Sequence, residues 1–391
     1  MRIIYANRGE APGSHPQYEA AFARERSLSG IPMETLQFHY VGYVKKYGWK
    51  RMWDEVIRMT DEFHPDLIYF HHFNHFGDEG PADCIRQLKM RQHAPLFFGS
   101  WGDLFQQSYF HLWRRPIPRG LVEMAVCADA FFPTSMGRSA DFLGRQGARN
   151  IVFMPHVYSD EHFGSPPFPH FKKEFSVVMC GGIGTDYHHP VQSIGRSITR
   201  IPAGFRISHR YGNRACIVGR GWQHLPIKTS GVVAFKDQVN LFLRSEIAID
   251  ARAPYDEEYY ASDRPFFIAG CGVPLIQFYT PRFEKIFQPN LHAYYAHSAS
   301  ELVKVCDQVL AMDPNLRNEN AEAAMQLIRT RHMADNRIDT IVSVADALLK
   351  CRDESITAEE ALGRVRLWHF LPTVCLSEEK KHAIKYWKPS L

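Results

Sequence analysis

The sequence predicts an α/β protein built from two Rossmann-like domains that face a central cleft, and three observations lead to this prediction. In the first half, short apolar strands alternate with helical patterns, which is typical of a parallel sheet with helices on both faces. A segment rich in proline, glycine and charge interrupts the pattern near residue 159, and a second strand–helix series follows it. The chain of 391 residues is long enough for two domains, each with its own core.

The first domain is expected over residues 1–158. Short apolar runs predict its strands, at 2–6, 34–38, 67–70, 96–98, 130–133 and 151–154. Runs of helical character between them predict its helices, near 16–27, 49–63, 81–92, 121–126 and 138–146. This alternation indicates one doubly wound domain.

The linker is expected at 159–174 and the second domain at 175–350. The strands of the second domain are predicted at 175–179, 215–218, 231–234, 247–251 and 275–278. Its helices are predicted over 264–271, from about 281, and over 300–312 and 318–350. Residues 351–391 are expected to form a helical segment that packs back across the domains. The cleft is expected between the carboxyl ends of the two sets of strands.

Composition excludes several classes of protein. Hydrophobic residues make up 45% and charged residues 23%, which are ordinary values for a soluble globular protein. No apolar run reaches the roughly 18 residues of a membrane span, and the first ten residues are too polar for a signal peptide, so the expected location is the cytoplasm. The eight cysteines include no C-x-x-C pair, which argues against a zinc site. A net charge of +4 is compatible with an anionic substrate but does not require nucleic acid.

The stretch from Tyr259 to Phe287 contains the most informative motif of the chain. Its predicted helix over 264–271 is followed by a Gly-Val-Pro break and an apolar strand. Ser262, Asp263 and Arg264 would therefore lie at a helix N-terminus, where backbone N–H groups and the helix dipole favour an anion. The motif indicates a phosphate-binding position.

This motif resembles the sugar-nucleotide-binding motif of GT-B glycosyltransferases, and most closely that of the spore maturation protein CgeB-like family. The residues that match the family pattern are Tyr260, Ser262, Asp263, Arg264, Cys271 and Gly272. The resemblance is clearest between about 128 and 342, and it implies the GT-B fold and a nucleotide-diphosphate sugar as donor. It also implies donor contacts, from Tyr260, Ser262, Asp263, Arg264 and Gly272. One departure is Phe267, which stands where the family usually has the glutamate that holds the donor ribose or sugar.

A glycine turn follows the strand predicted at 175–179. Gly181, Gly182 and Gly184 would let backbone amides approach a diphosphate closely, although their spacing is not that of dinucleotide-binding proteins. His188 lies beside this turn and is a candidate hydrogen-bond donor to the same ligand. The alternatives are a tight strand-to-helix turn and a solvated loop histidine.

Two arginines are candidates for holding the diphosphate. Arg220 follows a predicted strand and Arg264 opens a predicted helix, and the planar guanidinium suits two phosphate oxygens. Such a cation can stabilise the departing nucleoside diphosphate without a metal, so neither a metal nor a cofactor is expected. The alternative for Arg220 is a solvated surface residue. By resemblance, Val233 is expected to flank the nucleobase.

Candidate acceptor residues follow two predicted strands of the first domain. Asp103 is a candidate base for the acceptor hydroxyl, and Trp101 is a candidate for stacking on the acceptor. The alternative for Asp103 is a turn or helix-capping residue. His72 and His75 are candidate acceptor contacts, and their loop does not match the helical H-E-x-x-H zinc pattern.

The predicted function is transfer of a hexosyl or pentosyl group from a nucleotide-diphosphate sugar to a hydroxyl acceptor. The acceptor is left open among a glycan, a protein, a small molecule and a hydroxylated pyrimidine in DNA, the last as in phage-type enzymes. Two alternatives remain: an inactive nucleotide-sugar-binding protein, suggested by Phe267, and a sugar-nucleotide epimerase with the same fold. Retention and inversion of the sugar configuration both stay open.

Overall fold

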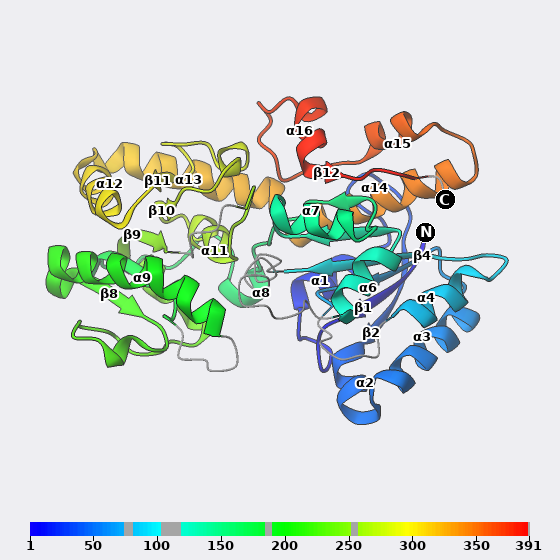
Figure 1. Ribbon diagram of the computed structural model, residues 1–391. Coiled ribbons are helices and arrows are strands. Elements are labelled where there is room, and N and C mark those ends of the chain that lie inside the picture. Colours follow the sequence, from blue (N-terminus) through cyan, green and yellow to red (C-terminus); the bar gives the residue numbers. More distant parts are fainter. Residues whose placement is uncertain (74–80, 103–118, 184–189, 252–256, 390–391) are drawn as a thin grey trace. The chain divides into compact units, whose positions relative to one another are not determined.

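The computed structural model describes residues 1–73, 81–102, 119–183, 190–251 and 257–389, with the backbone alone at 190–198. These residues form two compact units (Figure 1). The first unit consists of Met1–Pro155, Ala334–His369 and Thr373–Leu391, and the second of His156–Met333 and Phe370–Pro372. Each unit contains one β-sheet with helices between its strands, so the predicted α/β fold class is confirmed.

The first unit is built on a seven-stranded sheet with the strand order β12-β6-β5-β4-β3-β1-β2. Strands β1 to β6 are parallel, and β12 is antiparallel to β6. All residues of β3 and β4 are buried, as expected for parallel strands covered on both faces. The strand bounds are β1 Arg2–Asn7, β2 Glu34–His39, β3 Leu67–Phe70, β4 Leu96–Trp101, β5 Ala130–Pro133, β6 Ile151–Val152 and β12 Ile384–Lys385.

The helices of the first unit cover this sheet and extend into the C-terminal part of the chain. Helix α3 buries Met52, Val56 and Met59 at helical spacing, which gives it one apolar face towards the core. Helix α14 is buried around most of its circumference, and it packs on α1 and α15. The bounds are α1 Pro16–Phe22, α2 Tyr40–Tyr47, α3 Trp49–Phe63, α4 Ala82–Lys89, α6 Arg119–Cys127, α7 Arg138–Arg145, α14 Ala334–Arg352, α15 Ala358–Arg364 and α16 Leu376–Ala383.

The second unit is built on a five-stranded parallel sheet with the order β11-β10-β9-β7-β8. Its strands are β7 Phe175–Cys180, β8 Ala215–Val218, β9 Ser245–Asp250, β10 Leu275–Phe278 and β11 Tyr294–Ala296. Its helices are α8 Asp160–Phe163, α9 Pro190–Tyr211, α10 Gln238–Leu243, α11 Arg264–Gly270, α12 Ala299–Ala311 and α13 Pro314–Arg331. One face of the sheet forms a core with α9 and α12, in which Trp222 is fully buried.

The strand order reverses once in each sheet. In the first unit β1 lies between β2 and β3, and in the second unit β7 lies between β8 and β9. Open α/β sheets bind ligands outside the carboxyl ends of the strands at such a point, because the connections leave it in opposite directions. These two edges are therefore the expected positions of a ligand site.

The division of the chain differs from the expected boundaries. Helix α14 lies in the first unit rather than in the second domain, because its buried surface packs on α1 and α15. The helical run expected over 318–350 is two helices, α13 and α14, separated at His332 and Met333. The segment expected as a linker at 159–174 belongs to the second unit and contains the short helix α8.

Other local predictions were wrong. Residues 231–234 form no strand, and Val232 is 67% exposed. The helix expected from about 281 is a single 3₁₀ turn at Phe283–Lys285. Helix α2 and strands β11 and β12 were not predicted. None of the helices in the described ranges is long and apolar enough to cross a membrane.

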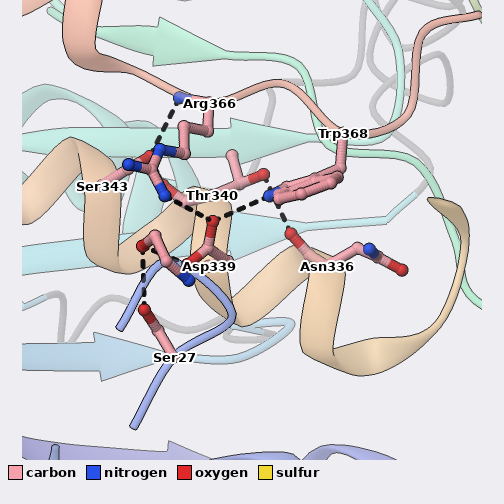
Figure 2. Close-up of polar contacts among 8 residues, drawn as sticks. Ser27, Asn336, Asp339, Thr340, Ser343, Arg366 and Trp368 are labelled. Atoms are coloured by element: carbon pink, nitrogen blue, oxygen red, sulfur yellow. Dashed lines mark hydrogen bonds and ion pairs between the residues drawn. The ribbon is translucent and has the colours of Figure 1, made fainter. Parts of the chain in front are cut away.

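A buried carboxylate, Asp339 on α14, holds three segments of the first unit together (Figure 2). Its Oδ1 accepts hydrogen bonds from the backbone N–H (2.8 Å) and the hydroxyl (2.5 Å) of Ser29, and its Oδ2 accepts one from Trp368 Nε1 (2.7 Å). Nη1 of Arg366 lies 3.8 Å from Oδ2. Burial by itself raises the pKa of Asp339, but these hydrogen bonds outweigh it and hold the pKa below its ordinary value. The four residues are called the Asp339 clasp below.

Candidate functional site

The carboxyl edge of the second sheet begins with the glycine turn after β7. The N–H of Gly181 donates to the carbonyl of Val218 (2.8 Å), and the carbonyl of Gly181 accepts a hydrogen bond from Trp222 Nε1 (2.7 Å). These bonds hold the turn against the end of β8. The N–H of Gly182 donates to no atom of the residues that the structure describes, so it remains available to a ligand.

The turn after β8 contacts the glycine turn through the backbone. Gly219 has a φ of +142°, and a Cβ built there would lie 2.5 Å from the carbonyl carbon of Gly181 and 2.6 Å from the nitrogen of Gly182. A Cβ at Gly182 would lie 2.9 Å from the carbonyl oxygen of Arg220. Because neighbouring backbone atoms come this close, only glycine fits at 182 and 219. Sequence reasoning missed Gly219, although it directly follows an apolar strand.

Arg200, a buried residue on α9, joins the ends of the two strands at the reversal point. Its Nη1 donates to the carbonyl of Gly182 (2.5 Å), and its Nε donates to the carbonyl of Ala251 (2.5 Å). Gly182 follows β7 and Ala251 follows β9, so one guanidinium holds together the segments that follow these two neighbouring strands. Sequence reasoning missed Arg200 because nothing in the helix around it distinguishes it from a surface arginine.

Arg264 is the first residue of α11, and its guanidinium lies at the end of β9. Nη1 is 3.7 Å from Oδ1 of Asp250, the last residue of β9, and the Arg264 side chain is only 21% exposed. The hydroxyl of Ser262 links the two residues, because it donates to Asp250 Oδ1 (3.2 Å) and accepts from the N–H of Arg264 (3.3 Å). Ser262 therefore links the first backbone N–H of the helix to the Asp250 carboxylate.

Charges around Arg264 keep it cationic. Burial alone would lower the pKa of Arg264, but the carboxylates of Asp263 and Asp250 raise it above its usual value. Burial also raises the pKa of the Cys180 thiol to about 12, so Cys180 is neutral at physiological pH. The guanidinium thus stays charged next to the ends of β7 and β9.

Three buried polar groups at this edge have no hydrogen-bond partner among the described residues. They are Oδ2 of Asp250, Nε of Arg264 and the side-chain amide of Gln277. Gln277 pairs in register with Asp250 on neighbouring parallel strands, so both side chains project from the same face of the sheet. Buried polar groups are nearly always hydrogen-bonded in native proteins, so this group of residues is suited to a polar ligand. Gln277 was missed; its signal was a glutamine inside the apolar run LIQF.

The other predicted donor residues differ in burial and in position. Tyr260 is buried and Asp263 is half-buried, both beside the start of α11. Arg220 has an exposed side chain, and its contribution to the turn is its backbone. Val233 is half-buried in an irregular segment that follows β8. Gly184 and His188 lie outside the described residues.

Gly272 does not lie with the other candidates. It lies two residues after the end of α11 with a φ of +67°, its N–H donates to the carbonyl of Ala269 (2.9 Å), and it precedes β10. It is therefore at the amino-terminal edge of the sheet, whereas Arg264 and Gly182 are at the carboxyl edge. The positive φ explains the glycine as a helix C-terminal turn residue.

Phe267 is part of an aromatic cluster. Its ring centroid lies 4.2 Å from that of Phe163 and 5.2 Å from that of Phe235. Phe235 is 43% exposed, so one edge of the cluster reaches solvent. The structure thus has an apolar contact where the resemblance implied a carboxylate.

The first unit carries candidates at the carboxyl edge of its own sheet. Trp101 ends β4, and the ring of His72 lies beside Gly102, where an added Cβ would be 3.3 Å from Nδ1. His72, just after β3, and Gly102, just after β4, therefore lie side by side. His71, which belongs to the same histidine cluster, is buried here and shares a 3.0 Å hydrogen bond with the hydroxyl of Tyr5. Asp103 and His75 lie outside the described residues.

The two α/β units, each with a reversed strand order, match the GT-B fold of glycosyltransferases. Comparisons with known proteins agree with this. A family model described as glycosyl transferase-like matches residues 204–343, which run from α9 into α14. A comparison with curated proteins gave no match.

Solved structures with this fold are similar over nearly their whole length. An α,α-trehalose-phosphate synthase (UDP-forming) from Burkholderia vietnamiensis has a TM-score of 0.57 at 12% identity, with 91% of this chain and 99% of that chain covered. A sucrose-phosphate synthase from Thermosynechococcus elongatus has a TM-score of 0.56 at 12% identity, with 88% and 98% covered. HepE of Anabaena, in complex with UDP and glucose, has a TM-score of 0.54 at 13% identity, with 86% and 98% covered. At these identities the likeness establishes the fold.

Proposed function

We propose that this protein is a glycosyltransferase that moves a hexosyl or pentosyl group from a nucleotide-diphosphate sugar to a hydroxyl acceptor. The observation that carries the proposal is the Arg264 guanidinium, which is held at the strand reversal of the second sheet with Nε free of any described partner. The available N–H of Gly182 lies at the end of the neighbouring strand β7. A cation and a backbone donor at this position suit a diphosphate. The match to the glycosyl transferase-like model over 204–343 supports the same assignment.

In the proposed reaction the acceptor oxygen bonds to the anomeric carbon as the bond from that carbon to the diphosphate oxygen breaks. The nucleoside diphosphate leaves with the electron pair, and Arg264 stabilises its charge. We assign this role to the guanidinium rather than to a bound metal or cofactor. The acceptor proton passes to a base if the configuration inverts, or to the leaving phosphate if it is retained. UDP-sugars are the first donors to test, since HepE was crystallised with UDP and glucose.

A second candidate is a nucleotide-sugar-binding protein without transfer activity, and Phe267 favours it because the aromatic cluster supplies no carboxylate. Thermal shift with UDP-, GDP- and TDP-sugars identifies the donor, because a ligand of the native state raises the melting temperature. Incubation of that donor without acceptor then separates the functions. Slow release of free sugar supports the transferase, an epimeric product supports the epimerase, and binding alone supports the binding protein.

Arg264→Ala is expected to weaken binding of the donor's nucleoside diphosphate by about tenfold or more, because one charge-assisted contact to phosphate is lost. Binding of the nucleoside should change little, since it has no phosphate. Isothermal titration with both ligands measures the difference. Arg206→Ala is the matched control, because Arg206 is an exposed arginine in the second half of α9 and is not a candidate for the site. Equal losses for nucleoside and diphosphate would remove Arg264 from the site.

Asp103 is proposed as the base for an inverting reaction, since it follows the carboxyl end of β4, two residues after Trp101. Asp103→Asn should keep donor affinity and thermal stability but lower the transfer rate by about 10² or more, as loss of a general base does. The measurement is single-turnover transfer at saturating donor. Transfer at a wild-type rate would make Asp103 a turn residue and favour retention.

A further inference from the structure

A cavity of about 340 Å³ opens at the amino-terminal edge of the first sheet. Leu96, the first residue of β4, lines it together with Asp129 and Asn150, which directly precede β5 and β6. This edge is opposite to the carboxyl ends of β3 and β4, where His72 and Trp101 lie. The cavity is therefore separate from the acceptor residues proposed in the same unit.

The floor of this cavity is fixed by hydrogen bonds. Asp129 accepts from Lys89 Nζ (2.8 Å) and from the N–H of Phe97 (2.8 Å), so its charge is already used within the protein. The side chain of Asn150 donates to the carbonyl of Asp129 (2.7 Å) and accepts from the N–H of Lys388 (2.7 Å). The C-terminal segment is thus tied to the sheet edge, and the cavity is a built feature rather than a surface gap.

Cationic side chains outnumber acidic ones in the lining. Asp129 is the single carboxylate, and the cations are Arg86, Lys89, Arg149, Arg352 and Lys388. Three of these cations have a partner within the protein. Lys89 pairs with Asp129, Arg86 pairs with the exposed Asp83, and Arg352 Nη1 donates to the carbonyl of Ala94 (2.7 Å).

Arg149 and Lys388 have no such role. Both side chains are exposed, and neither has an acidic partner among the residues that the structure describes. Cations often stabilise the C-terminal end of a helix, which accounts for Lys89 on α4 and Arg352 on α14. That explanation does not apply to Arg149 or Lys388, because neither lies in a helix. Their charges remain available to an anion.

Apolar side chains form the rest of the wall. They are Ile85, Leu96, Val126, Leu348 and Pro389. A volume of this size lies at the lower end of the range for small-molecule sites, which combine apolar walls with a few polar groups. The combination suits a ligand with an anionic group and a compact carbon skeleton.

We propose that this cavity is a second ligand site, which binds a small phosphorylated organic molecule. The phosphate contacts Arg149 and Lys388, and the carbon skeleton packs against Val126 and Leu348. The site does not depend on the function proposed for the second unit. Bound ligand also covers Cys127, a half-buried thiol in the lining.

Cys127 allows occupancy to be measured at the cavity itself. The full-length protein is treated with a maleimide in the presence of phenyl phosphate, and the modification of each cysteine is followed by peptide mass spectrometry. At about ten times its dissociation constant, phenyl phosphate should slow modification of Cys127 about tenfold by mass action. The exposed Cys375, which is not in the lining, should react at an unchanged rate. Phenol, which lacks the phosphate, should protect neither.

A charge-matched pair of variants tests the assignment of residues. R149Q/K388Q should weaken protection of Cys127 by about tenfold or more. K50Q/K381Q removes the same charge from exposed positions of the first unit outside the cavity. In this variant phenyl phosphate should protect Cys127 as it does in the wild type. Arg264→Ala should also leave protection unchanged, which separates this site from the proposed donor site. No protection by millimolar phenyl phosphate, equal protection by phenol, or equal effects of the two double variants would overturn the proposal.

Discussion

Replacing Gly219 with alanine is expected to reduce sugar transfer by about two orders of magnitude, because the added Cβ cannot fit beside the glycine turn. It would lie 2.5 Å from the carbonyl carbon of Gly181 and 2.6 Å from the nitrogen of Gly182, so backbone must move. A displacement of about 1 Å in a positioning group can cost about 10² in rate. The rate of transfer and the affinity for the donor are to be measured with the same donor.

Gly212→Ala is the matched control for this variant. Gly212 also has a positive φ, of +53°, but a Cβ built there meets nothing within 4 Å. Both variants therefore introduce backbone strain, and only Gly219→Ala moves the turn. Donor affinity within about twofold of wild type for Gly219→Ala would show that the turn does not bind the diphosphate.

Asp339→Ala is expected to lower the free energy of unfolding of the first unit by about 3 kcal/mol or more at neutral pH. The substitution removes the acceptor of three hydrogen bonds in the Asp339 clasp and leaves the N–H of Ser29 and Nε1 of Trp368 without that acceptor. Hydrogen bonds to a charged group contribute about 1.5 to 3 kcal/mol each, and unpaired donors add a desolvation cost. Urea denaturation followed by tryptophan fluorescence measures the loss.

The effect of Asp339 should depend on pH in one direction. The pKa of Asp339 is lower in the folded protein, so its stabilisation is complete above its unfolded pKa of about 3.9 and is lost as the pH falls below it. The difference between wild type and Asp339→Ala should therefore shrink below about pH 4. Asp83→Ala in the same unit is the control, since the Arg86–Asp83 pair is largely exposed and contributes about 1 kcal/mol or less. Equal losses for the two variants would contradict a special role for the Asp339 clasp.

Local sequence patterns predicted the strands well where burial and pattern agreed. The bounds of β3, β5, β8 and β10 match the predictions, because each is a short apolar run with a clear break on either side. The prediction was wrong at 231–234, where the residues favour a strand but do not form the regular backbone hydrogen bonds of a sheet. There the N–H of Ser230 donates to the carbonyl of Ile217 and the N–H of Gly219 to that of Gly231, so the segment follows β8 without pairing regularly. Propensity alone does not reveal that Val232 is exposed.

The candidate site was predictable only in its local parts. Arg264 and Ser262 stand in one short motif, so sequence could place them at a helix start. Arg200 and Gln277 act through residues far away in the chain, and their roles depend on which strands become neighbours. Gly272 was predicted to lie beside Arg264 because the two residues are close in the sequence. Helix α11 separates them, so they lie at opposite edges of the sheet.

The assignment of α14 to the first unit determines the order in which the two units can be completed during synthesis. The second unit is almost entirely encoded by the continuous segment His156–Met333, whereas the first resumes only at Ala334. All five strands of the second sheet have therefore been synthesised before α14, with its Asp339, leaves the ribosome. Until then the first unit lacks the helix that packs on α1, and a fragment that ends at residue 155 lacks it permanently. The natural fragment for isolating one unit is thus the internal segment and not the N-terminal half.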